Sequence, residues 1–197
     1  IGFVKRSANM NAPLEGYKIG FIGLGHMGEP MARHLHAAGA ELFVHNRSQD
    51  RVTKMVSEHP DITNLGSPAE VASHVGSGII VTMLTNAPAV EAVHSALLPE
   101  ILSGALIIDM STTGLSKTRE LAAQFAKRGV GYVDAPVSGG EVGAKEASLA
   151  IMAGGADEDF ARAKPVLHVL GAKVTHLGPV GAGQITKLAN QTIVGIG

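Results

Sequence analysis

The chain has 197 residues, of which 45% are hydrophobic, 17% charged and 4% aromatic, and its formal net charge is −1. This is the composition of a globular protein, and without a basic excess we expect no nucleic-acid partner. The chain has no cysteine, which excludes disulfide and thiol chemistry and suits a reducing compartment, so we expect a cytoplasmic protein. The strongest apolar run, residues 78–84, is far too short to span a bilayer, so no membrane partner is expected.

The first nine residues include Lys5 and Arg6 but no acidic residue. They could end a transit peptide or an upstream leader, or belong to a segment added to the natural chain, which would then start at Met10. We therefore leave this segment out of the fold prediction.

The hydrophobic pattern alternates along the chain between the period of a strand and the period of a helix. It predicts strands at 17–22, 41–45, 78–84, 105–109, 130–134, 148–152 and 173–176, with a weak strand at 61–65. It predicts helices at 27–38, 48–58, from 67, at 87–95, at 116–127 and at 157–169. Such alternation is typical of an α/β fold with a doubly wound, mostly parallel sheet covered by helices on both faces.

The last segment has a different pattern. After Gly181, an apolar stripe of Ile185, Leu188, Ala189, Ile193 and Ile196 continues to the end of the chain. It predicts the start of a long helix that buries this stripe and leads towards a further domain absent from the chain.

A Gly-x-Gly-x-x-Gly motif follows the first predicted strand and opens the first helix, the context of a dinucleotide-binding loop. Its glycines permit a tight turn (Gly23), close approach of a pyrophosphate (Gly25) and close helix packing (Gly28). The motif predicts cofactor binding by Gly23, Leu24, Gly25, His26, Met27 and Gly28. An ordinary glycine-rich turn is the alternative, and the strand and helix around the motif argue against it.

The end of the second strand indicates which dinucleotide binds. An NAD site usually has Asp or Glu here to bind the ribose hydroxyls, whereas this chain has Asn46, Arg47 and Ser48. A guanidinium and a hydroxyl can bind a 2′-phosphate, so we predict NADP, with NAD possible. Alternatively, Arg47 is a solvated surface charge and Ser48 only caps the next helix.

Residues that follow two central strands are expected beside the cofactor, because ligands of such sheets lie outside the carboxyl ends of the strands. Met83, Leu84 and Thr85 end the strand at 78–84, and Ser111 and Thr112 follow the strand at 105–109. We select Met83, Leu84 and Thr112 as cofactor residues, with ordinary loop residues as the alternative.

A second glycine-containing loop follows the strand at 130–134. The hydroxyl of Ser138 and the backbone N–H groups of Gly139 and Gly140 can form a small anion site suited to a substrate carboxylate. By spacing alone, a simple tight turn is about as good an interpretation.

The last helix places Lys187, Asn190 and Gln191 at i, i+3 and i+4, and so on one face. A lysine whose pKa is lowered by burial is a suitable general acid/base, and amides can orient a hydroxyl or carboxylate. An exposed helix with a solvated lysine is the alternative.

These motifs resemble the β-hydroxyacid dehydrogenases, which include 3-hydroxyisobutyrate dehydrogenases and tartronate semialdehyde reductases. Four signatures occur in the family's order: residues 23–28, 109–112, 134–140 and 181–191. The segments 138–141 and 186–191 look most like tartronate semialdehyde reductases, whereas Asn46 and Thr85 depart from them, where Asp and Pro are usual. The 6-phosphogluconate dehydrogenases share the Ser-Gly-Gly run but have His-Asn in place of Asn190-Gln191.

The resemblance implies roles for the matching residues. Lys187 would be the catalytic acid/base, Ser138, Gly139 and Gly140 would hold the substrate carboxylate, and Asn190 and Gln191 would lie beside the lysine. Thr112 would lie near the nicotinamide. The substrate would be a small β-hydroxy acid or its semialdehyde, and the full-length protein would be a homo-oligomer with an all-helical second domain. The resulting division is a tail at 1–16, an NADP-binding Rossmann domain at 17–179 and the start of an interdomain helix at 180–197.

Nine histidines raise the question of a metal site. His34 and His36 point to different faces of one helix, and no His, Asp or Glu set has ligand spacing, so we predict no metal. The alternative to a dehydrogenase is a non-catalytic module that binds NADP(H).

Overall fold

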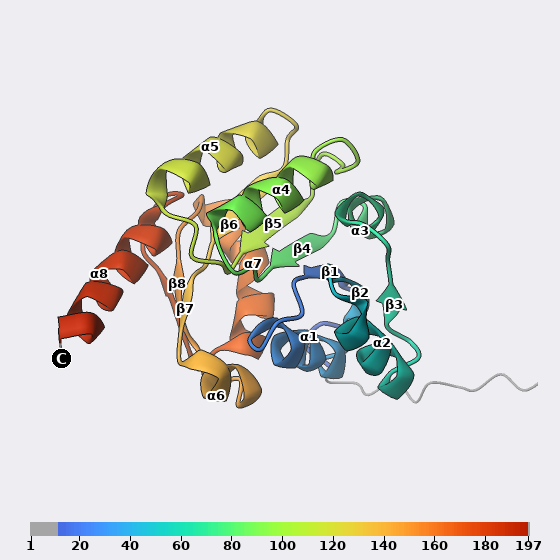
Figure 1. The fold of residues 1–197 in the computed structure, drawn as a ribbon. Helices are drawn as coiled ribbons and strands as arrows, with labels where there is room; N and C mark the ends of the chain where they lie inside the picture. The colour runs from blue at the N-terminus through green and yellow to red at the C-terminus, as the bar shows by residue number, and fades with distance from the viewer. Residues whose placement is uncertain (1–11, 197) are drawn as a thin grey trace, which may run out of the picture.

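The computed structural model describes residues 12–196, with the side chains of residues 193–196 left out (Figure 1). Its main sheet has six parallel strands in the order β3-β2-β1-β4-β5-β6. The strands are β1 (Lys18–Ile22), β2 (Glu41–His45), β3 (Thr63–Asn64), β4 (Ile79–Thr82), β5 (Leu106–Asp109) and β6 (Gly131–Asp134). This order, which reverses direction between β1 and β4, confirms the predicted doubly wound α/β fold of the Rossmann type.

Helices cover both faces of the sheet, as the alternating pattern predicted. They are α1 (Gly28–Ala37), α2 (Gln49–Glu58), α3 (Pro68–Val75), α4 (Ala87–Leu97), α5 (Leu115–Ala126) and α7 (Asp157–Leu170). Side chains of α1, α2 and α7 share one buried core with Ile19 and Phe21, and those of α3, α4 and α5 share the other with Ile80 and Ile107. Neighbouring strand residues such as Ile79 and Ile80 therefore enter opposite cores.

A second, three-stranded sheet lies beside the first. It contains β7 (Val137–Ser138), β8 (Ala150–Ala153) and β9 (Lys173–His176), with β7 antiparallel and β9 parallel to β8. The sequence predicted strands close to β8 and β9, but it missed β7 and the short helix α6 (Gly140–Lys145). Both elements are too short to show a hydrophobic period in the sequence. Where they meet, Gly139 and Gly140 have φ of +132° and +59°.

Helix α8 (Ala182–Ile196) extends away from the body of the molecule to the end of the chain (Figure 1). The expectation that its apolar stripe is buried was wrong for the residues that the structure describes, because Ile185 is 49% and Leu188 is 68% exposed. The face turned inward carries Gly183 and Gln184 instead. Hydrogen bonds and close backbone packing, rather than apolar contact, therefore seat the helix on the domain.

Residues 12–16, which the sequence assigned to the tail, form a turn on the main core. Leu14 is fully buried, and its N–H donates to Ala38 O over 3.0 Å. The rest of the predicted tail, including Met10, lies outside the described residues. Within residues 12–196, no helix is both long and apolar enough to cross a membrane.

Candidate functional site

The glycine loop between β1 and α1 is shaped by two close backbone approaches, at Gly23 and Gly28. Gly23 has φ +103°, and a Cβ there would collide with Met83 O, while a Cβ on Gly28 would collide with Gly23 O. Gly25 is exposed, and a Cβ added to it would have nothing within 4 Å. The structure thus gives Gly23 and Gly28 packing constraints and leaves open space over Gly25, where a pyrophosphate can approach.

Two glycine substitutions separate these roles. Gly28→Ala should lower the free energy of unfolding by about 1–3 kcal/mol, because its new methyl group meets backbone that cannot move aside. Gly25→Ala should leave stability nearly unchanged and weaken dinucleotide binding, because its methyl group enters the open space over the loop. Denaturant unfolding and NADPH titration of both variants measure the two effects. The assignment fails if Gly25→Ala binds NADPH as tightly as the wild type.

The remaining loop residues lie in different surroundings. Leu24 has its side chain in the core, and its N–H donates to Asn46 Oδ1 over 2.9 Å. His26 is exposed, while Met27 is half-buried and occupies the N-cap position of α1. The first N–H groups of a helix have no carbonyl partners within it, so the start of α1 can receive an anion.

A cavity of about 260 Å³ opens beside this loop, at the carboxyl ends of β1, β2 and β4. This is the point where the strand order reverses, and where ligands of such sheets bind. Its lining includes six of the predicted cofactor residues: Gly23, Gly25, Asn46, Arg47, Met83 and Leu84. Sequence reasoning missed His45 and the start of α4, where Ala89, Ala92 and Val93 follow at i, i+3 and i+4. Small residues at helical spacing directly after a central strand were the available signal.

The residues at the end of β2, where the 2′-phosphate is predicted to bind, differ in the hydrogen bonds and ion pairs that they make. Both ends of the Asn46 amide are engaged, because Oδ1 accepts from Leu24 N and Nδ2 donates to Ser48 O over 2.8 Å. Ser48 takes the N-cap position of α2 as predicted, but its hydroxyl makes no capping hydrogen bond. Arg47 is exposed at the rim of the cavity and makes no ion pair within residues 12–196. Among the residues that the structure describes, Arg47 is thus a cation without an ion-pair partner, at the cavity rim.

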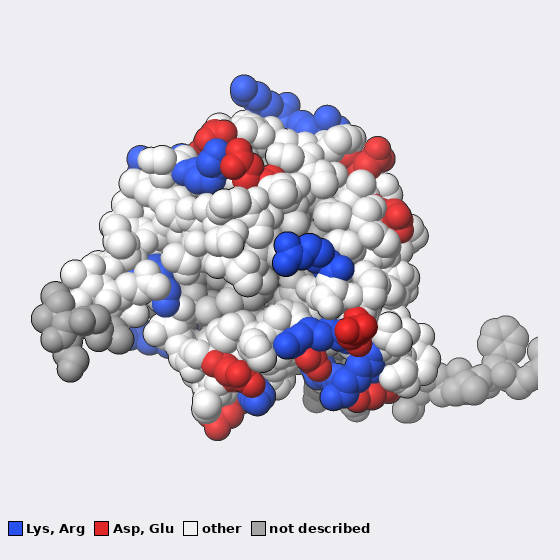
Figure 2. Space-filling view, in the orientation of Figure 1, with Lys and Arg blue, Asp and Glu red and all other residues white. Residues whose placement is uncertain are grey.

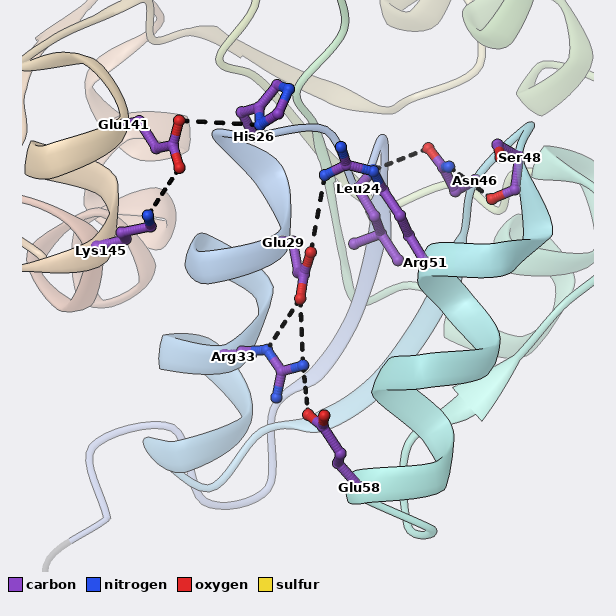
Figure 3. A network of polar contacts seen from close by, with 10 residues as sticks. All are labelled: Leu24, His26, Glu29, Arg33, Asn46, Ser48, Arg51, Glu58, Glu141 and Lys145. Carbon is purple, nitrogen blue, oxygen red and sulfur yellow. Dashed lines mark hydrogen bonds and ion pairs between the residues drawn. The ribbon is translucent and has the colours of Figure 1, made fainter.

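Two arginines nearby, Arg33 and Arg51, are paired with acidic residues. Figure 2 shows acidic and basic side chains gathered over α1 and α2, and Figure 3 shows how they connect. Arg33 contacts Glu29 at 3.2 Å and Glu58 at 2.6 Å, and Arg51 faces Glu29 at 3.8 Å. Glu29 and Glu58 therefore offset these two guanidinium groups, in contrast to Arg47.

The loop after β5 lies next to the loop after β4. Ser111 is buried, and its Oγ accepts from Leu84 N over 2.9 Å. Thr112, the residue predicted to lie near the nicotinamide, is exposed in this loop. The two loops therefore form one continuous edge, which runs from the cavity towards β6.

The predicted substrate loop is open to solvent. Ser138 is half-buried, Gly139 and Gly140 are exposed, and a Cβ on Gly140 would have nothing within 4 Å. Ser138 lines a groove of about 320 Å³ together with Asn190 of α8. The structure thus brings together two residues that lie far apart in the sequence and were both assigned to the substrate.

Lys187 lies against the same loop. Its Nζ donates to the carbonyl oxygen of Val137, the residue before Ser138, over 2.7 Å. The side chain is partly buried, and this burial lowers the pKa of its ammonium group below the usual lysine value. Gln191, placed beside the lysine by the sequence, is exposed. Lys187 and Asn190 therefore turn towards the domain, and Gln191 faces solvent.

The cofactor loop and helix α1 both contact α6, the helix that follows the substrate loop. His26 Nδ1 lies 3.8 Å from Glu141 Oε2, and Glu141 also pairs with Lys145 at 2.7 Å (Figure 3). Further along the chain, within α1, His34 Nε2 lies 2.9 Å from Lys145 O. Helices α1 and α6 are therefore neighbours, and the two glycine loops that precede them open on the same side of the domain.

Comparison with known proteins shows which family the chain belongs to. Residues 18–178 match the model of the NAD binding domain of 6-phosphogluconate dehydrogenase. The 2-hydroxy-3-oxopropionate reductase of Escherichia coli K12 is 40% identical over 185 residues, which are 91% of this chain and 61% of that protein. The chain belongs to the β-hydroxyacid dehydrogenase family.

Solved structures agree with this assignment to the β-hydroxyacid dehydrogenases. The 3-hydroxyisobutyrate dehydrogenase of Mycobacterium tuberculosis with L-serine superposes with a TM-score of 0.85 at 32% identity, over 90% of this chain and 60% of that one. Psf3 in complex with NADP+ and 2-OPP gives a TM-score of 0.82 at 28% identity, over 89% of this chain and 62% of that one. The chain thus spans about 60% of the length of these relatives.

Proposed function

We propose that the chain is the cofactor-binding part of an NADP-dependent β-hydroxyacid dehydrogenase. The enzyme interconverts a small β-hydroxy acid and its semialdehyde, and it is most like a 2-hydroxy-3-oxopropionate reductase. The observation that carries this proposal is the position of Lys187, whose partly buried amine donates to Val137 O, directly before the Ser138 loop. A lysine with a lowered pKa beside an open, glycine-lined turn is suited to acid/base chemistry on a bound hydroxy acid.

In this proposal the residues of the chain transfer the proton and hold the substrate. The nicotinamide cofactor supplies or accepts the hydride. Lys187 takes the hydroxyl proton during oxidation and returns it to the oxygen during reduction. The hydroxyl of Ser138 and the N–H groups of Gly139 and Gly140 hold the carboxylate, and the amide of Asn190 orients the substrate from the other side of the groove.

The preference for NADP is supported by the charges at the end of β2. An Asp or Glu at position 46 would repel a 2′-phosphate, whereas Asn46 is neutral and already holds the glycine loop. Arg47 is exposed at the cavity rim and makes no ion pair within the described part of the chain. The complex of the relative Psf3 with NADP+ agrees with this choice.

The lowered pKa of Lys187 predicts opposite pH dependences for the two reaction directions. Oxidation needs the neutral amine, so its rate should rise as pH increases through this pKa and level off above it. Reduction needs the ammonium, so its rate should fall over the same range. Because burial lowers the pKa of Lys187, both rate curves should change slope at a pH below the usual pKa of a lysine. Rate profiles measured in both directions test this, and two curves with the same slope would contradict the role.

The proposal as a whole is tested with a panel of small hydroxy acids and semialdehydes, assayed on the full-length protein with NADPH, NADH and their oxidised forms. The expected result is turnover of at least one pair, faster with NADP(H). NADPH binding without turnover of any panel member would favour a non-catalytic module. We further propose a cytoplasmic homo-oligomer for the whole protein, which cell fractionation and sedimentation test.

A further inference from the structure

Gln184 lies one turn before Lys187 on α8 and is nearly fully buried, with 3% of its surface exposed. Its Oε1 accepts from the backbone N–H groups of Thr113, over 3.0 Å, and Gly114, over 3.2 Å. Its Nε2 donates to Ser111 O over 2.9 Å. One side chain on the helix of the lysine therefore holds three backbone groups of the loop that follows β5.

The same turn of α8 is fixed from a second direction by Asp134, the last residue of β6. Its carboxylate accepts from the backbone N–H groups of Gly181, over 2.6 Å, and Gln184, over 2.9 Å. Gly183 packs so closely that a Cβ there would lie 2.8 Å from Asp134 Oδ2. The first turn of α8 thus has little freedom to shift against the sheet, and Lys187 follows it after about one helical turn.

The loop that Gln184 contacts is itself held by Asp109, which is fully buried at the end of β5. Asp109 Oδ1 accepts from Ser111 N over 3.1 Å, and Oδ2 accepts from Thr113 Oγ1 over 2.9 Å. Ser111 also holds Leu84 of the loop after β4. Because the cavity beside the glycine loop occupies the ends of β1, β2 and β4, the other half of an extended dinucleotide bound there would reach the loop after β5.

We propose that Gln184 is a positioning residue for the reaction. It fixes α8 against the loop after β5, and so sets the separation between the Lys187 amine and the nicotinamide half of the cofactor. The inference rests on the proposed function, because it assumes that Lys187 and the nicotinamide meet. Small displacements matter at such a site, since a misplacement of about 1 Å can cost about 100-fold in rate.

The test uses Gln184→Met, which nearly conserves volume and removes all three hydrogen bonds. The Lys187 ammonium is titrated by NMR, with Lys187→Arg to assign the signal, and binding is measured for NADPH and for 2′-phospho-ADP-ribose, which lacks the nicotinamide. We expect the Lys187 pKa to rise towards the usual lysine value as the amine gains solvent. NADPH affinity should fall about two- to tenfold, and 2′-phospho-ADP-ribose affinity should change less than about twofold.

Two more variants distinguish positioning from general stability. Thr192→Ala, on the same helix, removes an exposed hydroxyl that donates to Leu188 O of its own helix, and it should change neither measurement. At high pH, Gln184→Glu cannot donate to Ser111 O and places a carboxylate oxygen against that carbonyl, so it should weaken NADPH binding as Gln184→Met does. At low pH its protonated carboxyl can again accept from the loop and donate to Ser111 O, so NADPH affinity should recover.

The inference is overturned if Gln184→Met and Gln184→Glu lower only the melting temperature and leave the Lys187 pKa and both affinities at wild-type values. That result would not touch the proposed function. A wild-type chain that binds no NADPH would contradict the proposed function, while the Lys187 titration would still decide whether Gln184 positions the amine.

Discussion

Replacing Lys187 with alanine should lower turnover of the hydroxy acid by about 10²- to 10⁴-fold, the usual contribution of a positioned acid/base group. The dissociation constant for NADPH should stay within about twofold of wild type, because the cavity assigned to the dinucleotide is lined by β1, β2, β4 and α4 and not by α8. Steady-state rates and fluorescence titration of NADPH measure the two quantities.

Two matched variants control this experiment. Lys187→Arg keeps a cation on the same helix face but cannot release its proton near neutral pH, so it should remain nearly inactive. Lys127→Ala removes an exposed lysine at the end of α5 and should behave as wild type. A large fall in NADPH binding on loss of Lys187, or normal turnover by Lys187→Arg, would show that the lysine does not act as acid/base.

Replacing Arg47 with alanine should weaken NADPH binding by about 10- to 100-fold and leave NADH binding almost unchanged. The loss corresponds to about 1.5–3 kcal/mol, the range for hydrogen bonds to charged groups. It is selective because only NADPH carries the 2′-phosphate that the exposed guanidinium at the cavity rim can reach. The binding of both cofactors is measured at fixed ionic strength, since salt screens exposed charges.

The control for Arg47 is Lys54→Ala, which removes the same charge from an exposed position on the adjacent helix α2. If general electrostatic attraction decided the affinity, Lys54→Ala would also weaken NADPH binding. Equal losses of NADH and NADPH affinity in Arg47→Ala would refute the assignment of this side chain to the 2′-phosphate.

The sequence predicted those parts of the fold whose signals are local. Buried strands such as Ile79–Thr82 appear as short apolar runs, and the glycine loop is recognised from the strand before it and the helix after it. Chain order and loop position then placed Asn46, Arg47, Met83 and Leu84, all of which line the cavity. Parallel strands end on one edge of the sheet, so residues directly after them come together without further information.

Features that depend on residues far apart in the sequence could not be predicted from local patterns. The apolar stripe of α8 indicated which residues share a face, but Ile185 and Leu188 turn outward, because Gln184 and Asp134 seat the opposite face through hydrogen bonds. The bond from Thr113 N to Gln184 joins residues 71 positions apart. Asp109 and Asp134 were visible as acids at strand ends, but no local pattern indicated that both are buried.

The most direct test of the account is a structure of the chain with NADP+ and a small β-hydroxy acid bound. The account predicts the 2′-phosphate at Arg47, the pyrophosphate over Gly25 and the nicotinamide beside the loop after β5. It also places the Lys187 amine within about 3 Å of the hydroxyl oxygen of the acid. A nicotinamide bound elsewhere, with the Lys187 amine still on Val137 O and far from the hydroxyl, would contradict it.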